Sequence, residues 1–192
     1  MTHDRLDDAL RRFLPVLARR TLEAAAAGQP SPTAAATADV AGLPLPDGLD
    51  APRGVFVTLT VGGRLRGCIG VIEAVRPLGD AVQENALAAG YRDPRFEPLT
   101  ADEMDDLHIE VSVLTPMRKV GGPDDIEIPR HGVLLTKGGR RAVFLPQVAE
   151  EQGWDRDTTL TQLALKAGLD PDDWREGATF SVFEADAIHE HR

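Results

Sequence analysis

The sequence predicts a mixed fold in which antiparallel β-hairpins are flanked by helices. Helical periodicity near the N-terminus and after residue 77 predicts the helices, and two β-rich segments with Gly-Gly turns predict the hairpins. The chain has 192 residues, of which 42% are hydrophobic. This is enough apolar material for one sizeable core, or for two closely packed lobes, without disulfide staples.

The N-terminal segment predicts a helix from about residue 4 to residue 27. Apolar residues recur there at helical spacing, at Leu6, Leu10, Phe13 and Leu17. Pro15 predicts a break or kink, and Gly28 would end the helix. Residues 28–52 are rich in Ala, Pro and Gly, and we interpret them as a surface connection.

The first hairpin joins a strand from Val55 to a second strand that contains the only cysteine, Cys68. Gly62-Gly63 between them is typical of a two-residue hairpin turn. With regular pairing, Val57 lies opposite Cys68, so the cysteine face is partly apolar and a half-buried thiol is favoured. A bulge at Gly67 would reverse that conclusion.

The remaining elements follow from local signals. A helix is predicted from Pro77 to about Gly90, and Thr100 with Glu103 has the spacing of a capping box. Residues 108–114 alternate as a strand, with Ile109, Val111 and Val113 on its apolar face and His108, Glu110 and Ser112 on its polar face. A second Gly-Gly hairpin is predicted over residues 132–145, followed by a helix that Asp157 caps. A closing strand is predicted over residues 179–183, and a frayed tail over residues 189–192.

Composition narrows the class of function. The net charge of −10 and the isoelectric point near 4.9 disfavour general attraction to nucleic acid or anionic membranes. A single cysteine argues against a disulfide scaffold or zinc ribbon and fits a reducing compartment. No signal peptide or membrane-spanning stretch is predicted, so we expect a cytoplasmic protein without a membrane partner.

Cys68 is the principal candidate for chemistry. It lies two residues after Arg66 and between Gly67 and Gly70, where the guanidinium favours the thiolate and the glycines allow close backbone approach. The alternative is that Cys68 is a small buried hydrophobic residue, as free cysteines usually are.

Other polar residues suggest a second set of contacts. Asp93 and Arg95 flank a proline, and they either orient a small anionic ligand or form a structural ion pair. His108 and Glu110 share a strand face, and with His131 they are metal ligands in type, but their spacing gives no support, so no metal site is predicted. No nucleotide-binding fingerprint is present, and the cofactor is left unknown.

These motifs resemble the AMMECR domain proteins, whose prokaryotic members include protein A of the AmmeMemoRadiSam system. The resemblance covers roughly residues 54–183. It is carried by Leu65 to Gly70, Asp93 to Phe96, Ile109 to Pro116, His131-Gly132, Leu145 to Val148, Gly153-Trp154, Lys166 to Leu169, and Trp174.

The resemblance implies a single domain over residues 1–192, with an α+β fold, a larger and a smaller lobe and a cleft between them. It also implies association with a Memo-like protein and a radical S-adenosylmethionine protein. It does not supply a reaction.

Two hypotheses follow. In the first, the protein is an enzyme or enzyme component: Cys68 is nucleophile or carrier, Glu110 or His131 handles protons, and ligand contacts come from Arg66, Gly67, Gly70, Asp93, Arg95 and Gln147. In the second, the protein is a non-catalytic adaptor or substrate-presenting subunit in which Cys68 is structural. A nucleic-acid role, resting on a possible arginine patch, is unlikely for so acidic a chain.

Overall fold

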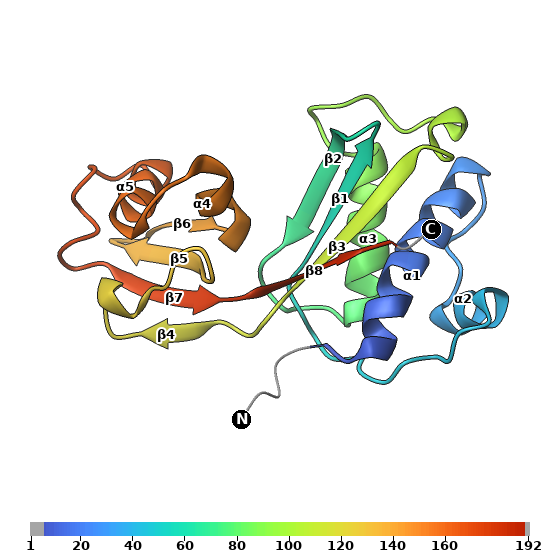
Figure 1. Ribbon diagram of the computed structural model, residues 1–192, viewed down its shortest axis with the longest axis horizontal. Coiled ribbons are helices and arrows are strands. Elements are labelled where there is room, and N and C mark those ends of the chain that lie inside the picture. The colour runs from blue at the N-terminus through green and yellow to red at the C-terminus, as the bar shows by residue number, and fades with distance from the viewer. Residues whose placement is uncertain (1–5, 191–192) are drawn as a thin grey trace. The chain divides into compact units, whose positions relative to one another are not determined.

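The computed structural model describes residues 6–190 and divides into two compact units. The first contains the chain up to Leu114 together with the segment from Asp186, and the second is Thr115–Ala185. Each unit has its own four-stranded sheet, built from antiparallel pairs, with helices beside it (Figure 1). The α+β class predicted from the sequence is confirmed.

In the first unit the strand order is β2-β1-β3-β8, so β2 is an edge strand. The strands are β1 (Val55–Val61), β2 (Arg64–Val71), β3 (Leu107–Leu114) and β8 (Ala185–His189). The helices are α1 (Asp8–Ala26), α2 (Ala34–Ala41), α3 (Leu78–Tyr91) and the short 3-10 helix η1 (Ala101–Glu103). Helix α3 contacts β1 and β2, whereas α1 contacts α3 and β3.

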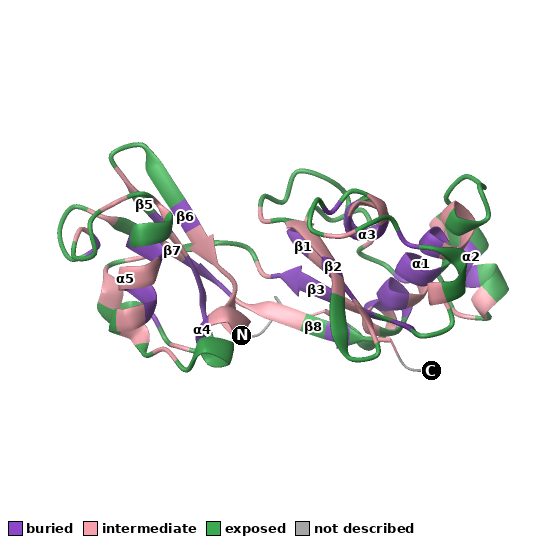
Figure 2. Ribbon diagram, turned by 90° about the horizontal axis from the view of Figure 1, so that it is seen from above, coloured by how far each residue is buried: buried purple, intermediate pink, exposed green. Residues whose placement is uncertain are grey.

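The core of this unit lies between these helices and one face of the sheet. Side chains of a strand point alternately to opposite faces, and in β1 the alternate residues Val55, Val57 and Leu59 are buried. Figure 2 shows the buried positions on α1, α3 and β3. The apolar face predicted for residues 108–114 is confirmed, and the main core side chains are Phe13, Leu14, Leu17, Val55, Val57, Leu59, Ile109, Val111 and Val113.

The second unit has the strand order β4-β7-β5-β6. Its elements are β4 (Arg118–Val120), the 3-10 helix η2 (Pro123–Asp125), β5 (Gly132–Lys137), β6 (Arg140–Phe144), α4 (Pro146–Gln152), α5 (Arg156–Lys166) and β7 (Thr179–Phe183). Its separate core includes Leu135, Leu160, Leu163, Trp174 and Phe180.

Both predicted Gly-Gly hairpins are present, as β1-β2 and β5-β6. Gly62 and Gly63 have φ of 56° and 74°, and Gly138 and Gly139 have φ of 57° and 79°. Two successive positive φ values match the right-handed twist of the strands, and glycine adopts them without a steric penalty.

The N-terminal region differs from the prediction in two ways. Helix α1 begins at Asp8, after the N-cap Asp7, and continues through the buried Pro15 without a break, because its apolar face is packed into the core. Residues 4 and 5 of the predicted helix lie outside the described part. The surface connection predicted over 28–52 contains α2, which Thr33 caps and Gly42, in the left-handed region, ends.

Two C-terminal predictions are also corrected. Asp155, and not Asp157, caps α5: its carboxylate accepts a hydrogen bond from the Thr158 N–H at 2.8 Å. The tail predicted from residue 189 belongs in part to β8, since Ile188 is buried in the core and the Glu190 N–H donates to the Ile109 carbonyl at 3.0 Å. Residues 191 and 192 lie outside the described part.

Candidate functional site

The pairing of β1 with β2 places Cys68 on the opposite face from the core. The prediction that Val57 lies opposite Cys68 is wrong, because Cys68 pairs with Thr58 and Gly67 pairs with Leu59. The register shifts between Leu59 and Thr60, which leaves Arg66 as the extra residue of a β-bulge. A one-residue shift exchanges the two faces of a strand, so Cys68 is aligned with polar Thr58 rather than with core valines.

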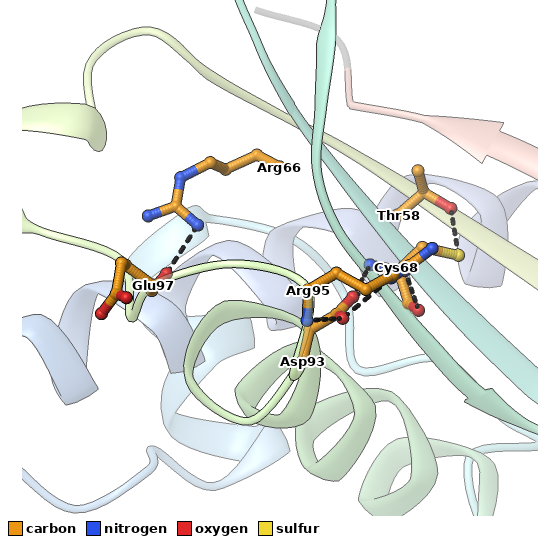
Figure 3. A network of polar contacts seen from close by, with 6 residues as sticks. All are labelled: Thr58, Arg66, Cys68, Asp93, Arg95 and Glu97. Atoms are coloured by element: carbon orange, nitrogen blue, oxygen red, sulfur yellow. Dashed lines mark hydrogen bonds and ion pairs between the residues drawn. The ribbon is translucent and has the colours of Figure 1, made fainter.

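The thiol is half-buried and has one polar neighbour from the next strand. The Thr58 hydroxyl donates to Sγ of Cys68 at 3.4 Å (Figure 3). Cys68 and Thr58 form a non-hydrogen-bonded pair, in which opposite side chains approach closely. Thr58 therefore supplies a hydroxyl donor to the sulfur from the facing strand.

An ion pair holds the backbone of Cys68 at the open edge of the sheet. The Cys68 N–H donates to Asp93 Oδ2 at 2.9 Å, and Arg95 Nη2 donates to the Cys68 carbonyl at 3.1 Å. These are the two groups that an edge strand leaves without a ladder partner. Asp93 and Arg95 therefore replace a neighbouring strand at this residue.

Asp93 and Arg95 also bind each other directly. Arg95 donates to the carboxylate from Nε at 2.9 Å and from Nη2 at 2.7 Å. The Asp93 side chain is only 1% exposed, whereas that of Arg95 is 53% exposed. Hydrogen bonding from the Arg95 side chain holds the pKa of Asp93 well below its usual range, with smaller contributions from the backbone N–H groups of Cys68 and Arg95.

The two glycines of the motif are needed for packing. A Cβ at Gly67 would collide with the Ala89 carbonyl of α3, so this glycine allows the end of α3, and hence Asp93 just after it, to approach β2. A Cβ at Gly70 would collide with the ring of Phe56, its partner on β1. These contacts are intramolecular; the predicted role of both glycines in ligand binding stays a prediction.

Arg66 is engaged away from the thiol. Its guanidinium donates to both carboxylate oxygens of Glu103, at 2.6 and 3.0 Å. It also donates to the Glu97 carbonyl at 2.7 Å (Figure 3). The hydrogen bond from Arg66 lowers the pKa of Glu103 to about 2. Glu103 also accepts from the Thr100 N–H at 2.9 Å, which confirms the predicted capping box. Both arginines are balanced by a carboxylate, Arg66 by Glu103 and Arg95 by Asp93, but of the two only Arg95 is seen to donate to Cys68, through the Cys68 carbonyl.

Glu110 lies on the same sheet face as Cys68. Thr58 pairs with Cys68 on one side and with Glu110 on the other, so the three residues form a row across β2, β1 and β3. Ser112 donates to Glu110 Oε1 at 3.0 Å, and His189 of β8 continues the row, with Nδ1 3.6 Å from Glu110 Oε2. Cys68 and Glu110 are two strand spacings apart, roughly 10 Å, so a bound substrate would have to lie between them.

His131 and Gln147 belong to the second unit. His131 is buried, its Nδ1 accepts from the Glu127 N–H at 3.0 Å, and burial lowers its pKa. Gln147 lies in the first turn of α4 and is partly exposed. Their predicted roles, in proton transfer and ligand binding, stay predictions.

The AMMECR1 family model matches residues 15–188, which is most of the chain. The chain belongs to the AMMECR1 family.

Archaeal proteins resemble this chain along most of their length. A protein of Methanothermobacter thermautotrophicus is 45% identical over 76% of this chain and 80% of its own, and one of Methanosarcina mazei is 39% identical over 91% and 88%. The crystal structure of the uncharacterized protein PH0010 from Pyrococcus horikoshii has a TM-score of 0.80 and 35% identity, covering 95% of this chain and 92% of that one.

Two further observations concern the kind of site. Within residues 6–190, no group of three or more His, Cys, Asp or Glu side chains is placed to hold a metal ion. No helix in that same range is long and apolar enough to cross a membrane.

Sequence reasoning on this AMMECR1 domain missed Thr58 and His189. Regular pairing of the hairpin places Val57, and not Thr58, opposite Cys68. The bulge that shifts this register depends on pairing between the two strands and not on the local sequence pattern. His189 was hidden because the last residues carry no strong strand signal. The polar face predicted for residues 108–114 is the signal in the sequence that this side of the sheet holds polar groups.

Proposed function

We propose that Cys68 is the reactive group of this AMMECR1 protein, acting as a nucleophile or carrier in the cytoplasm. We further propose that the protein is component A of an AmmeMemoRadiSam-type system, with a Memo-like protein and a radical S-adenosylmethionine protein as partners. The partnership is supported by family membership and by the match of motifs along the chain.

The observation that carries the reactive role is that the site fixes the backbone of Cys68 but leaves its thiol half-exposed. Arg66, Gly67 and Gly70 each have a packing or hydrogen-bonding role in the fold. The thiol, by contrast, is only partly buried and accepts a hydrogen bond from Thr58, whereas cysteines that serve only as core residues are usually buried. A backbone clamped on both polar groups beneath an accessible side chain is the support that a reacting residue needs.

The geometry supports a proposed role for each neighbour. As nucleophile, the thiolate gives an electron pair to an electrophilic carbon of the substrate, and the leaving group departs with the pair from the broken bond. Thr58 donates to the sulfur, and the exposed guanidinium of Arg95 is available to an anionic group of the substrate. Glu110, on the same face, is the candidate for moving a proton.

A non-catalytic adaptor remains the second candidate. It is favoured by the same packing, because Gly67, Gly70 and the Asp93–Arg95 pair are all used inside the fold. In that case the motif serves to build a stable surface for a partner, and a small residue at position 68 would do as well as cysteine.

Alkylation of the single thiol separates the two candidates. We would measure the rate of iodoacetamide labelling from about pH 5 to 10 in native protein and in unfolded protein, whose thiol should titrate near 8.5. A faster native rate at pH 7, reduced by Arg95→Gln but not by Arg66→Gln, is expected. Native protection at every pH would overturn the nucleophile.

Cys68→Ala then tests the role in the assembly. We expect this variant to keep its thermal stability and its association with the purified Memo-like and radical proteins, while the system loses its activity. Loss of association in a folded Cys68→Ala protein would instead favour the adaptor. Absence of association by the wild-type chain would overturn the proposed partnership.

A further inference from the structure

The edge of β2 beyond Cys68 is open, unlike the part next to it. The loop after α3 covers the backbone edge at Cys68 through the Asp93–Arg95 pair, and its Glu97 carbonyl accepts a hydrogen bond from the side chain of Arg66. Gly70 is two residues further on, so its N–H and C=O point to the same edge as those of Cys68. Among residues 6–190 no donor or acceptor is found bonded to these two outward groups of Gly70.

A hollow lies beside this open edge, along the flank of α3. Its volume is about 370 Å³, and it is lined by Val71, Val75, Arg76, Ala81, Glu84, Asn85, Ala88 and Arg92. Val71 pairs with core-facing Val55, so its side chain lies on the helix side of the sheet. A side chain from a further strand beside β2 would enter the space between Val71 and α3.

The lining also indicates the chemistry of the occupant. Val75 is 71% exposed and Val71 39%, so apolar surface faces solvent here. Arg76 is paired with Glu84 at 3.1 Å, whereas Arg92 makes only a 3.4 Å hydrogen bond to the Glu84 carbonyl. The hollow therefore carries one excess positive charge on a chain whose net charge is −10.

We infer that this edge binds an extended, acidic segment of a partner protein by β-strand addition. One residue of an antiparallel segment exchanges both hydrogen bonds with Gly70, its neighbouring side chain fills the hollow, and a carboxylate pairs with Arg92. The Asp93–Arg95 pair ends the added ladder at Cys68. This inference does not depend on the chemistry proposed for the thiol.

A display library of random linear peptides is the probe, and the full-length chain is the target. We expect enrichment of peptides with an apolar residue near an Asp or Glu, and slowed hydrogen exchange at the Gly70 amide when a selected synthetic peptide is added. Arg92→Glu should weaken that peptide about tenfold, because the charge pair becomes repulsive. Enriched peptides that leave the Gly70 amide unprotected would overturn the inference, as would a library with no enrichment.

A matched pair of valines provides the control. Val75→Asp puts a negative charge into the hollow and should also weaken binding, whereas Val40→Asp alters a valine on α2 of similar exposure, 69%, and should not. If Val75→Asp and Val40→Asp weakened peptide binding equally, the proposed binding site would be overturned. Protection of the Gly70 amide that rises with protein concentration without peptide, together with a dimer in light scattering, would replace the partner segment by a second copy of this chain.

Discussion

Replacing Asp93 with asparagine removes the charge that holds the edge of the first sheet. The wild-type carboxylate accepts four hydrogen bonds, from the Cys68 N–H and from the N–H, Nε and Nη2 of Arg95. Asparagine keeps one acceptor oxygen and turns an NH₂ group toward the remaining donors. Hydrogen bonds to charged groups contribute about 1.5–3 kcal/mol each. Because Arg95 is half exposed and stays solvated, we expect a total loss of about 2–3 kcal/mol.

The contribution of Asp93 to the unfolding free energy should depend on pH. The folded-state pKa of Asp93 is depressed, so its contribution is fully present above the unfolded value of about 3.9 and is lost as the pH falls below it. The difference in unfolding free energy between wild type and Asp93→Asn should be constant above about pH 5 and shrink toward pH 3.

Urea unfolding followed by far-UV circular dichroism measures this difference. Tryptophan fluorescence cannot replace it, because Trp154 and Trp174 both lie in the second unit. Fluorescence instead shows whether that unit unfolds with the first. Asp102→Asn, at an exposed carboxylate of η1, is the control and should be near neutral. A loss for Asp93→Asn below about 0.5 kcal/mol, or one as large at pH 3 as at pH 7, would refute the reasoning.

Three further predictions concern the neighbouring contacts. Gly67→Ala should lower the unfolding free energy by about 2–3 kcal/mol, because the added methyl group meets the backbone of α3. Gly122→Ala is the control in the same urea unfolding assay and should leave the unfolding free energy unchanged, because the space around Gly122 is open. The buried imidazole of His131 should titrate below 6.5 by NMR, so stability should fall as the pH drops from 7 toward its folded-state pKa; titration above 6.5 would contradict this. Arg66→Gln should cost about 1 kcal/mol in the same urea assay without opening the sheet edge, and a Cys68 amide that exchanges faster in this variant would contradict the division of roles.

Local patterns in the sequence predicted most individual elements. The two Gly-Gly turns, the buried alternation of residues 108–114 and the capping box at Thr100 depend on residues close together in the chain, and all are present. The predictions differ from the structure where a local signal is weak or is outweighed by packing. The helix signals at Thr33 and Gly42 are weak because prolines lie on both sides of that segment, and in α1 the burial of the apolar face outweighs the cost of Pro15.

The candidate site was only partly predictable. The sequence by itself determined that Cys68 is the single thiol, that glycines flank it and that Asp93 and Arg95 are close to each other in the chain. Only the tertiary structure decided which arginine contacts Cys68. The bulge at Arg66 aligns Cys68 with Thr58, and the packing of α3 against Gly67 brings Asp93 to the sheet edge. Arg66 itself forms an ion pair with Glu103. Each of these depends on residues 10 to 37 positions apart, whose contacts follow from packing and hydrogen bonding across elements and leave no trace in local periodicity.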